Sequence, residues 1–270
     1  MDRYAVIGHP VEHSKSPLIH AAFAQQTGQQ LEYGKVLAPL DGFAATVAEM
    51  QAQGYSGANV TVPFKFEAYE LATELTPRAR QAGAVNTLSF SNQVIRGDNT
   101  DGVGLVRDIL HNLQFPLQGK RVLLIGAGGA AEGVLGPLLE ASPATLSVAN
   151  RSVDKAQAMV ARASAAGVSL AAHSFDALPG QVFDVVINAT SSGLSNERLP
   201  LSSGLFATDA LAYDMMYGRE TPFMQYAREE GVARIADGLG MLVEQAAEAF
   251  YLWRQVRPDT TAVISAMRAS

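Results

Sequence analysis

Two glycines at the end of a short apolar run are spaced to bind a diphosphate. Residues 122–125 are apolar, and Gly126, Gly128 and Ala131 follow with the spacing G-x-G-x-x-A. Gly126 allows a tight turn, Gly128 lets a diphosphate approach the main chain, and Ala131 permits close helix–strand packing. An ordinary glycine-rich turn is the alternative. The turn itself spans Gly126, Ala127, Gly128, Gly129 and Ala130, and the free N–H groups of the helix that follows would face the anion.

The residues about 20 positions further on indicate which nucleotide would bind. An NAD site usually carries an acidic residue there to bind the ribose hydroxyls. This chain has Asn150, Arg151 and Ser152, with Lys155 shortly after. A guanidinium binds a ribose 2′-phosphate through paired charge-assisted hydrogen bonds, so the pattern predicts NADP. Alternatively, Asn150 or Ser152 caps a helix beginning near Val153, and Arg151 is solvated.

Polar residues in the first half of the chain indicate a second site. Ser14 and Ser16 are two positions apart, so in an extended loop both hydroxyls lie on one side and could hold a carboxylate. Further polar residues lie near strand ends or helix starts: Asn59, Thr61, Lys65, Asn86 and Asp101. Helix capping by a serine or by Asp101, and solvation of Lys65, are the simpler alternatives. The placement predicts where a site lies but not its reaction.

These residues are set in alternating strands and helices, which predict an α/β fold. The helices between the first strands favour parallel pairing, and a hairpin is expected within residues 85–96. Residues 103–237 continue the alternation around the glycine turn, with helices expected over 103–113 and 156–166, which predicts a doubly wound, Rossmann-type domain. The predicted boundaries are 1–102 for an N-terminal α/β domain, 103–237 for the nucleotide domain, and 238–270 for C-terminal helices returning to the first domain.

Composition limits the classes of molecule that this protein is expected to bind. The 270 residues are 48% apolar, carry a formal net charge of −6, and contain no cysteine. Without a basic stripe, we expect neither nucleic acid nor a membrane surface as a partner. The five histidines lack metal-binding spacing, so no metal site is predicted. The absence of a leader-like or spanning apolar segment predicts a cytoplasmic protein.

Motifs along the whole chain resemble those of the shikimate dehydrogenase family. The matching segments are HSKSP at 13–17, NVTVPFK at 59–65, GAVNT at 83–87, GDNTDG at 97–102, GAGGAA at 126–131, NRS at 150–152, INAT at 187–190, DMMYG at 214–218 and GLGMLVEQAAEAF at 238–250. The order and number of these segments are far more specific than any single motif. The resemblance implies reversible NADPH-dependent reduction of 3-dehydroshikimate to shikimate.

The resemblance also implies a role for each candidate residue. Ser14 and Ser16 would bind the substrate carboxylate, and Lys65 and Asp101 would form the catalytic pair. The ring hydroxyls would be held by Thr61, Asn86, Tyr217 and Gln245. The cofactor would be held by the 126–130 turn, by residues 150–155 at the adenosine ribose phosphate, and by Thr190, Met215 and Gly238 near the nicotinamide. Hydride transfer builds negative charge on the ketone oxygen, which suits an ammonium proton donor.

One departure and several alternatives accompany the resemblance. Glu132 stands where family members often carry arginine, and an acid there could weaken cofactor binding. A quinate/shikimate dehydrogenase paralogue is the nearest alternative, although the serine pair favours shikimate and Arg151 disfavours NAD. A non-catalytic dinucleotide-sensing protein is less favoured because Lys65 and Asp101 are present, and a folate-type dehydrogenase lacks matching substrate motifs. A monomer or a homodimer is expected.

Overall fold

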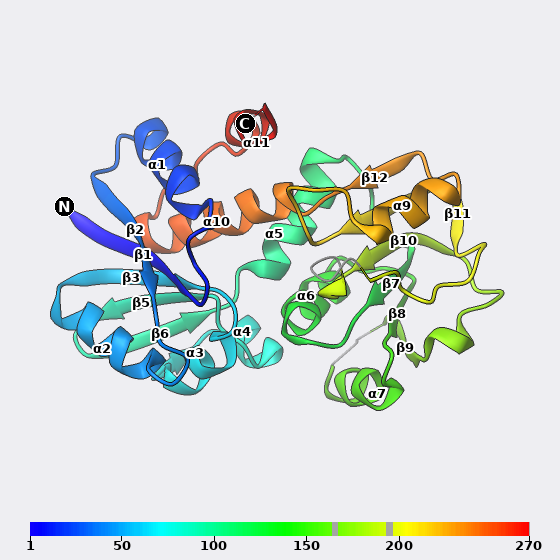
Figure 1. The fold of residues 1–270 in the computed structure, drawn as a ribbon, viewed down its shortest axis with the longest axis horizontal. Coiled ribbons are helices and arrows are strands. Elements are labelled where there is room, and N and C mark those ends of the chain that lie inside the picture. Colours follow the sequence, from blue (N-terminus) through cyan, green and yellow to red (C-terminus); the bar gives the residue numbers. More distant parts are fainter. Residues whose placement is uncertain (164–166, 193–196, 270) are drawn as a thin grey trace. The chain divides into compact units, whose positions relative to one another are not determined.

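The protein is α/β and divides into two compact units. The structure is a computed structural model and describes residues 1–163, 167–192 and 197–269. The first unit comprises Met1–Gly104 and the segment from Leu242 on, and the second unit comprises Leu105–Met241. Each unit is built on its own sheet (Figure 1). The predicted fold class is confirmed.

The first unit has a mixed sheet. Its described strands are β1 (Asp2–Gly8), β2 (Leu31–Leu37), β3 (Tyr55–Val60), β4 (Glu74–Leu75), β5 (Thr87–Ser91) and β6 (Val94–Asp98). They run in the order β2-β1-β3-β5-β6-β4. The pairs β1–β2 and β1–β3 are parallel, whereas β3–β5 and β5–β6 are antiparallel. The parallel pairing expected for the first strands is therefore confirmed.

The predicted hairpin accounts for the antiparallel part of the sheet. Asn92 and Gln93 connect β5 to β6 with φ angles of 47° and 67°. Two positive φ angles are typical of the two-residue turns that match the twist of a hairpin. Strands joined by so short a turn must run antiparallel. The hairpin consequently adds an antiparallel half to a sheet begun by β-α-β units.

Helices cover the first sheet, and two C-terminal helices return to this unit. The helices are α1 (Ser16–Thr27), α2 (Phe43–Ala52), α3 (Lys65–Leu71), α4 (Pro77–Ala82), α5 (Asp101–Arg107), α10 (Leu239–Arg254) and α11 (Thr261–Ala269). Phe23 of α1 and Phe250 of α10 are fully buried in one apolar cluster, their ring centroids 5.7 Å apart. Burying such a side chain contributes about 1.5–3 kcal/mol. This cluster fixes α10, which carries Gln245, against the N-terminal part of the unit.

The second unit has a parallel sheet with Rossmann order. Its described strands are β7 (Arg121–Ile125), β8 (Thr145–Ala149), β9 (Ser169–His173), β10 (Phe183–Asn188), β11 (Phe206–Asp214) and β12 (Arg234–Ala236). Their order is β12-β11-β10-β7-β8-β9, and the described pairs are all parallel. The strand order reverses between β7 and β10. Ligands of such sheets bind at that switch point, beyond the carboxyl ends of the strands.

The helices of this unit differ in detail from the sequence-based expectation. Those that the structure describes are η1 (Asp108–Asn112), α6 (Gly129–Glu140), α7 (Val153–Arg162), η2 (Phe175–Ala177) and α9 (Pro222–Glu229). The helix expected from 103 to 113 begins instead at Asp101, as α5, and becomes the π-helical η1 at Asp108. Asp108 is buried there and accepts a hydrogen bond from the Tyr213 hydroxyl at 2.7 Å. The expected helix 156–166 extends into residues 164–166, which lie outside the described residues.

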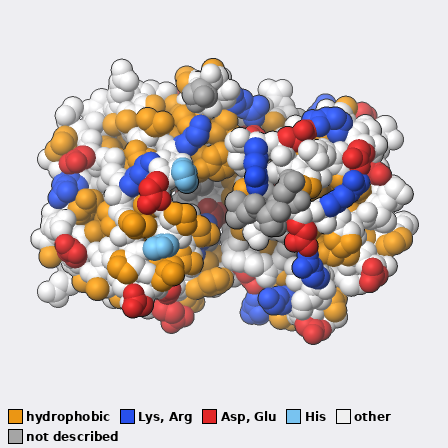
Figure 2. All heavy atoms as spheres, viewed as in Figure 1, with side chains coloured by type: hydrophobic (Ala, Val, Ile, Leu, Met, Phe, Trp, Pro, Cys, Tyr) orange, Lys and Arg blue, Asp and Glu red, His pale blue; other side chains and the backbone are white. Residues whose placement is uncertain are grey.

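Charge is distributed over the surface without a single-sign stripe on the face that Figure 2 shows, where acidic and basic side chains are interspersed. Within residues 1–163, 167–192 and 197–269, no helix is long and apolar enough to cross a membrane. The same described residues contain no cluster of histidine and acidic side chains that could hold a metal ion.

Candidate active site

Lys65 and Asp101 meet at one edge of the first sheet. Lys65 is the first residue of α3, shortly after β3, and Asp101 is the first residue of α5, shortly after β6. Lys65 Nζ donates a hydrogen bond to Asp101 Oδ2, and these side chains are 22% and 8% exposed. Lys65 is therefore not a solvated surface lysine. An ammonium held by a mostly buried carboxylate is suited to move a proton.

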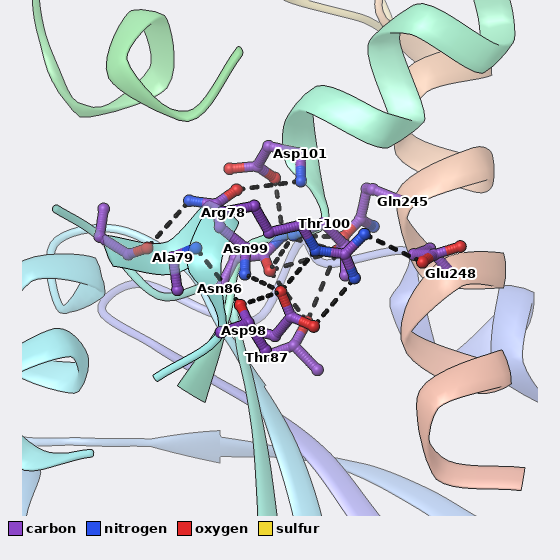
Figure 3. Close-up of polar contacts among 12 residues, drawn as sticks. Arg78, Ala79, Asn86, Thr87, Asp98, Asn99, Thr100, Asp101, Gln245 and Glu248 are labelled. Carbon is purple, nitrogen blue, oxygen red and sulfur yellow. Dashed lines mark hydrogen bonds and ion pairs between the residues drawn. The ribbon is translucent and has the colours of Figure 1, made fainter. Parts of the chain in front are cut away.

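Asn86 connects this pair to α10. Its side-chain nitrogen lies 2.8 Å from Asp101 Oδ1 and 3.4 Å from Gln245 Oε1, and donates to both. Its side-chain oxygen accepts from the backbone nitrogen of Thr100 at 2.9 Å. Figure 3 shows Asn86, Asp101 and Gln245 facing one another. The structure thus brings together four of the predicted residues: Lys65, Asn86, Asp101 and Gln245.

Asp101 is not simply a helix cap. Its backbone nitrogen donates to the side-chain oxygen of Asn99 at 3.1 Å. Both carboxylate oxygens of Asp101 are directed to side chains, one to Lys65 and one to Asn86. Asn99 therefore satisfies the first N–H of α5, which leaves the Asp101 carboxylate available for chemistry.

Ser14 and Ser16 are paired as predicted. The hydroxyl of Ser14 donates to that of Ser16 at 3.2 Å, so both hydroxyls lie on one side of the loop. Lys15 occupies the N-cap position of α1, which has no side-chain capping hydrogen bond. Neither serine is the N-cap residue, although the Ser14 hydroxyl also accepts a hydrogen bond from the Ser16 nitrogen at 3.3 Å. The two hydroxyls form a compact polar pair.

Thr61 and Tyr217 belong to different units. Thr61 follows β3, and its backbone nitrogen donates to the Ile7 carbonyl at 2.9 Å. A Cβ on Gly8 would lie 2.4 Å from Thr61 Cγ2, so this close approach requires glycine. Tyr217 lies in the second unit after β11, where burial raises the pKa of its phenol. Tyr217 therefore keeps its proton at neutral pH and can donate a hydrogen bond.

The glycine turn lies at the switch point of the second sheet. Gly126 follows β7 with φ of 114°, and a Cβ there would lie 3.2 Å from the carbonyl of Ala189. Gly128 is the N-cap of α6, and a Cβ there would meet no protein atom within 4 Å. The main chain at Gly128 therefore borders open space, next to the free N–H groups of a helix start. This cradle fits a diphosphate.

The predicted ribose-phosphate residues line one pocket. Its lining residues include Asn150, Arg151, Ser152, Lys155, Thr190 and Glu197. Ser152 occupies the N-cap position of α7 but makes no side-chain capping hydrogen bond, and the Asn150 amide donates to the Ser152 carbonyl at 2.9 Å. Arg151 pairs with Glu197 instead of being solvated alone. Two cations beside one pocket fit a 2′-phosphate, and one of them pairs with Glu197.

A buried pair of polar side chains holds the predicted nicotinamide-side residues together. Asn188, at the end of β10, donates to Asp214 at 3.1 Å and accepts from the Thr190 hydroxyl at 2.7 Å. The Met215 nitrogen donates to the Asn188 carbonyl at 2.9 Å. A Cβ on Gly238 would lie 2.2 Å from the Met215 carbonyl oxygen. Thr190, Met215 and Gly238 are thus gathered at the ends of neighbouring strands.

Glu132 has a local partner. It lies in the first turn of α6, and its carboxylate pairs with Arg162 of α7. Burial raises the pKa of Glu132, while Arg162 acts in the opposite direction. The ion pair offsets the negative charge that the sequence placed near the expected phosphates. Glu132 therefore has a counter-charge within the same unit.

Sequence reasoning missed several residues around these sites. Arg78 bridges Asp98 and Glu248 in the first unit, and Glu197 pairs with Arg151 in the second. Asp98 lies inside the recognised GDNTDG segment, so its motif could have indicated a role. Arg78 and Glu248 are 170 residues apart, and no local pattern indicates that pairing.

The fold and the two sites define the class of protein. A Rossmann unit with basic residues beside its ribose pocket, together with a second α/β unit bearing a Lys–Asp pair, is typical of NADP-dependent dehydrogenases. The chain belongs to the shikimate dehydrogenase family. Three family models match it: the shikimate dehydrogenase substrate binding domain at residues 6–88, shikimate/quinate 5-dehydrogenase at 108–196, and the shikimate 5′-dehydrogenase C-terminal domain at 238–268.

Individual relatives agree with this assignment. The chain is 79% identical to shikimate dehydrogenase (NADP(+)) of Methylobacillus flagellatus over 270 residues, which is all of both chains. It is 62% identical to shikimate dehydrogenase (NADP(+)) of Aromatoleum aromaticum, covering 99% of this chain and 97% of the relative. Among solved structures, shikimate 5-dehydrogenase of Thermus thermophilus in complex with NADP(H) and shikimate is 32% identical, with a TM-score of 0.87 and coverage of 100% and 99%.

Proposed function

We propose that this chain catalyses the reversible NADPH-dependent reduction of 3-dehydroshikimate to shikimate, with Lys65 and Asp101 as its proton-transfer pair. The observation that carries the proposal is the contact of Lys65 with the mostly buried Asp101 carboxylate, which Asn86 also contacts. Membership in the family supplies the substrate and cofactor classes. The arrangement supplies a proton donor whose orientation is fixed.

The substrate would be held by side chains of distinct chemistry. Ser14 and Ser16 would donate hydrogen bonds to the carboxylate, since their hydroxyls are already side by side. The remaining predicted contacts, Thr61, Asn86, Tyr217 and Gln245, would bind ring hydroxyls. Amide and hydroxyl groups can both donate and accept, which suits a polyhydroxylated ring.

The second unit would hold NADP. The backbone of Gly126, Ala127, Gly128, Gly129 and Ala130 would bind the diphosphate. Arg151 and Lys155 would bind the 2′-phosphate beside Asn150 and Ser152, and Thr190, Met215 and Gly238 would contact the nicotinamide. When bound, the nicotinamide supplies or accepts the hydride of the reaction. Arg151 would exchange its Glu197 partner for the phosphate.

Lys65 would transfer the proton. In the direction of reduction, its Nζ ammonium donates a hydrogen bond to the ketone oxygen and then a proton as negative charge develops there. In the direction of oxidation, the neutral amine takes the hydroxyl proton. Asp101 orients Nζ and stabilises its charged form. Any pH profile would therefore report on the pair and not on one residue.

Absorbance of reduced nicotinamide tests the proposal. Purified protein is mixed with shikimate or quinate in combination with NADP⁺ or NAD⁺, and we expect efficient turnover only with shikimate and NADP⁺. Lys65→Ala should lower kcat by about 10²–10⁴-fold, the range of general acid–base catalysis. Lys120→Ala, which removes a lysine of the second unit, serves as the control. Intact turnover in Lys65→Ala with loss in Asp101→Asn would reverse the two roles.

The same measurements separate the alternatives. The family description matched by residues 108–196 names quinate as well as shikimate. Comparable turnover of quinate would identify the broader dehydrogenase. NADPH binding without turnover of any pair would favour the sensing protein, and Glu132 would then be substituted first.

We also propose a cytoplasmic location and a monomeric or homodimeric state. NADPH is an intracellular reductant, which favours the first statement. Light scattering coupled to size-exclusion chromatography would distinguish one copy from two, and cell fractionation would test the location.

A further inference from the structure

Arg78 of α4 bridges two carboxylates in the first unit. Its Nε and one terminal nitrogen donate to Asp98 Oδ1 at 2.6 Å and Oδ2 at 2.9 Å, and its other terminal nitrogen donates to Glu248 Oε1 at 3.0 Å. The three side chains are 24%, 7% and 10% exposed. Burial disfavours the guanidinium charge, but the two carboxylates outweigh it and raise the pKa of Arg78. Figure 3 shows Arg78 directed between them.

Asp98, one of the two partners of Arg78, begins the short segment that ends at Asp101. Asp98 is the last residue of β6, and its Oδ1 also accepts from the Asn99 nitrogen at 2.7 Å and the Thr76 hydroxyl at 2.8 Å. Its carbonyl accepts from the Asn86 nitrogen at 3.0 Å. Arg78 therefore fixes the start of the segment 98–101. The end of that segment is the carboxylate that contacts Lys65.

The Glu248 end leads to Gln245. The two residues are three positions apart on α10, so they lie on the same face of the helix. The second carboxylate oxygen of Glu248 accepts from Arg257, which completes its partners. Gln245 Oε1 lies 3.4 Å from Asn86. Arg78 thus ties the substrate-facing side of α10 to the strand end that precedes Asp101.

We propose that Arg78 is a positioning residue of the reaction, because its bridge between Asp98 and Glu248 holds Asp101 against Lys65 and Gln245 beside Asn86. The inference rests on the proposed roles of Lys65, Asp101 and Gln245. A planar guanidinium binds Asp98 with two parallel hydrogen bonds and still reaches Glu248. A lysine keeps the charge but cannot reproduce that fork.

A double-mutant cycle tests the inference. Arg78→Lys should lower kcat for shikimate oxidation about tenfold or more, because small displacements of catalytic groups have effects of up to about 10²-fold. The KM for NADP⁺ should be unchanged, since the nucleotide residues belong to the second unit. In the background of Asp101→Asn, Arg78→Lys should change the residual kcat by less than about twofold, because interacting residues are non-additive. Glu248→Gln should raise the KM for shikimate. If Arg78→Lys folds poorly, Glu248→Gln takes its place in the double-mutant cycle with Asp101→Asn.

Arg121→Lys is the matched control. Arg121 makes the same forked contact with Asp184 in the second unit, at 3.0 and 2.9 Å, and we expect its kcat to be that of the wild type. A merely structural role would reduce the active fraction, so the substitution at Arg78 would lower kcat by the same factor with and without Asp101→Asn. That outcome overturns the inference alone. Wild-type turnover in Asp101→Asn would overturn the proposed function and this inference together.

Discussion

Substitution of Arg151 tests how this protein distinguishes its nucleotides. The Arg151 side chain is 70% exposed and its partner Glu197 is 50% exposed. An exposed ion pair of this kind contributes about 0–1 kcal/mol. Hydrogen bonds to a charged group contribute about 1.5–3 kcal/mol. A 2′-phosphate should therefore displace Glu197. Subtracting the lost ion pair leaves a net gain of about 0.5–3 kcal/mol, and the middle of that range is about 1–2 kcal/mol.

That difference gives a measurable change in affinity. Arg151→Ala should raise the Kd for NADPH by about 5- to 30-fold, because about 1.4 kcal/mol corresponds to a factor of ten. The Kd for NADH should change by less than about twofold. NADH has no 2′-phosphate, so it makes no phosphate contact with Arg151 that the substitution could remove. Fluorescence titration of the reduced nucleotides measures both values on one preparation. Glu197→Gln should tighten NADPH binding by a smaller factor.

A matched variant separates this effect from a general loss of surface charge. Arg228 pairs with Glu220 in the same unit, and these side chains are 61% and 44% exposed. Arg228→Ala should leave both nucleotide affinities unchanged. Equal losses of NADPH and NADH affinity in Arg151→Ala would refute the phosphate assignment and assign Arg151 a role in local structure.

Two further predictions concern stability and the glycine cradle. His20 is fully buried and stacks on Tyr33 with ring centroids 4.1 Å apart, and burial lowers the pKa of His20 from its ordinary value of 6.5 to about 3. The unfolded chain therefore binds a proton between these values and the folded protein does not, so stability should fall by about 1.4 kcal/mol per pH unit as pH drops through that window. His20→Phe should remove this slope in urea unfolding measured from pH 7 to pH 4; an unchanged slope would assign the acid sensitivity to other groups. Gly128→Ala should change the urea midpoint no more than the control Gly34→Ala does, because a Cβ at either position meets no protein atom within 4 Å. Gly128→Ala should nevertheless abolish NADPH binding by obstructing the diphosphate. NADPH binding by Gly128→Ala would show that the diphosphate does not lie against Gly128.

Local sequence predicted most elements of the fold. Strand-to-helix turns such as Gly126 to Ala131 depend on neighbouring residues and on backbone geometry, so spacing suffices to find them. The parallel pairing of the first strands and the hairpin through Asn92 and Gln93 were predictable in the same way. The antiparallel pairing of this hairpin with β3 was not predicted, because it joins partners far apart in the chain.

The candidate site was likewise predictable from the sequence only in part. Residue types and order alone indicated the serine pair, Lys65 and Asp101, and the resemblance supplied their roles. Local reasoning left capping and solvation open as alternatives, since a serine or aspartate before a helix fits either function. The structure decided between them through particular contacts, namely Asn99 with the Asp101 nitrogen and Lys65 with the Asp101 carboxylate.

The sequence by itself determined the α/β class, the family, the nucleotide and the residues most suited to the chemistry, because these depend on short motifs and their order. Only the tertiary structure decided which charges neutralise one another. Arg162 joins Glu132, Glu197 joins Arg151, and Glu248 joins Arg78 across 170 residues. Such pairs depend on the three-dimensional proximity of side chains, which close spacing along the chain does not encode.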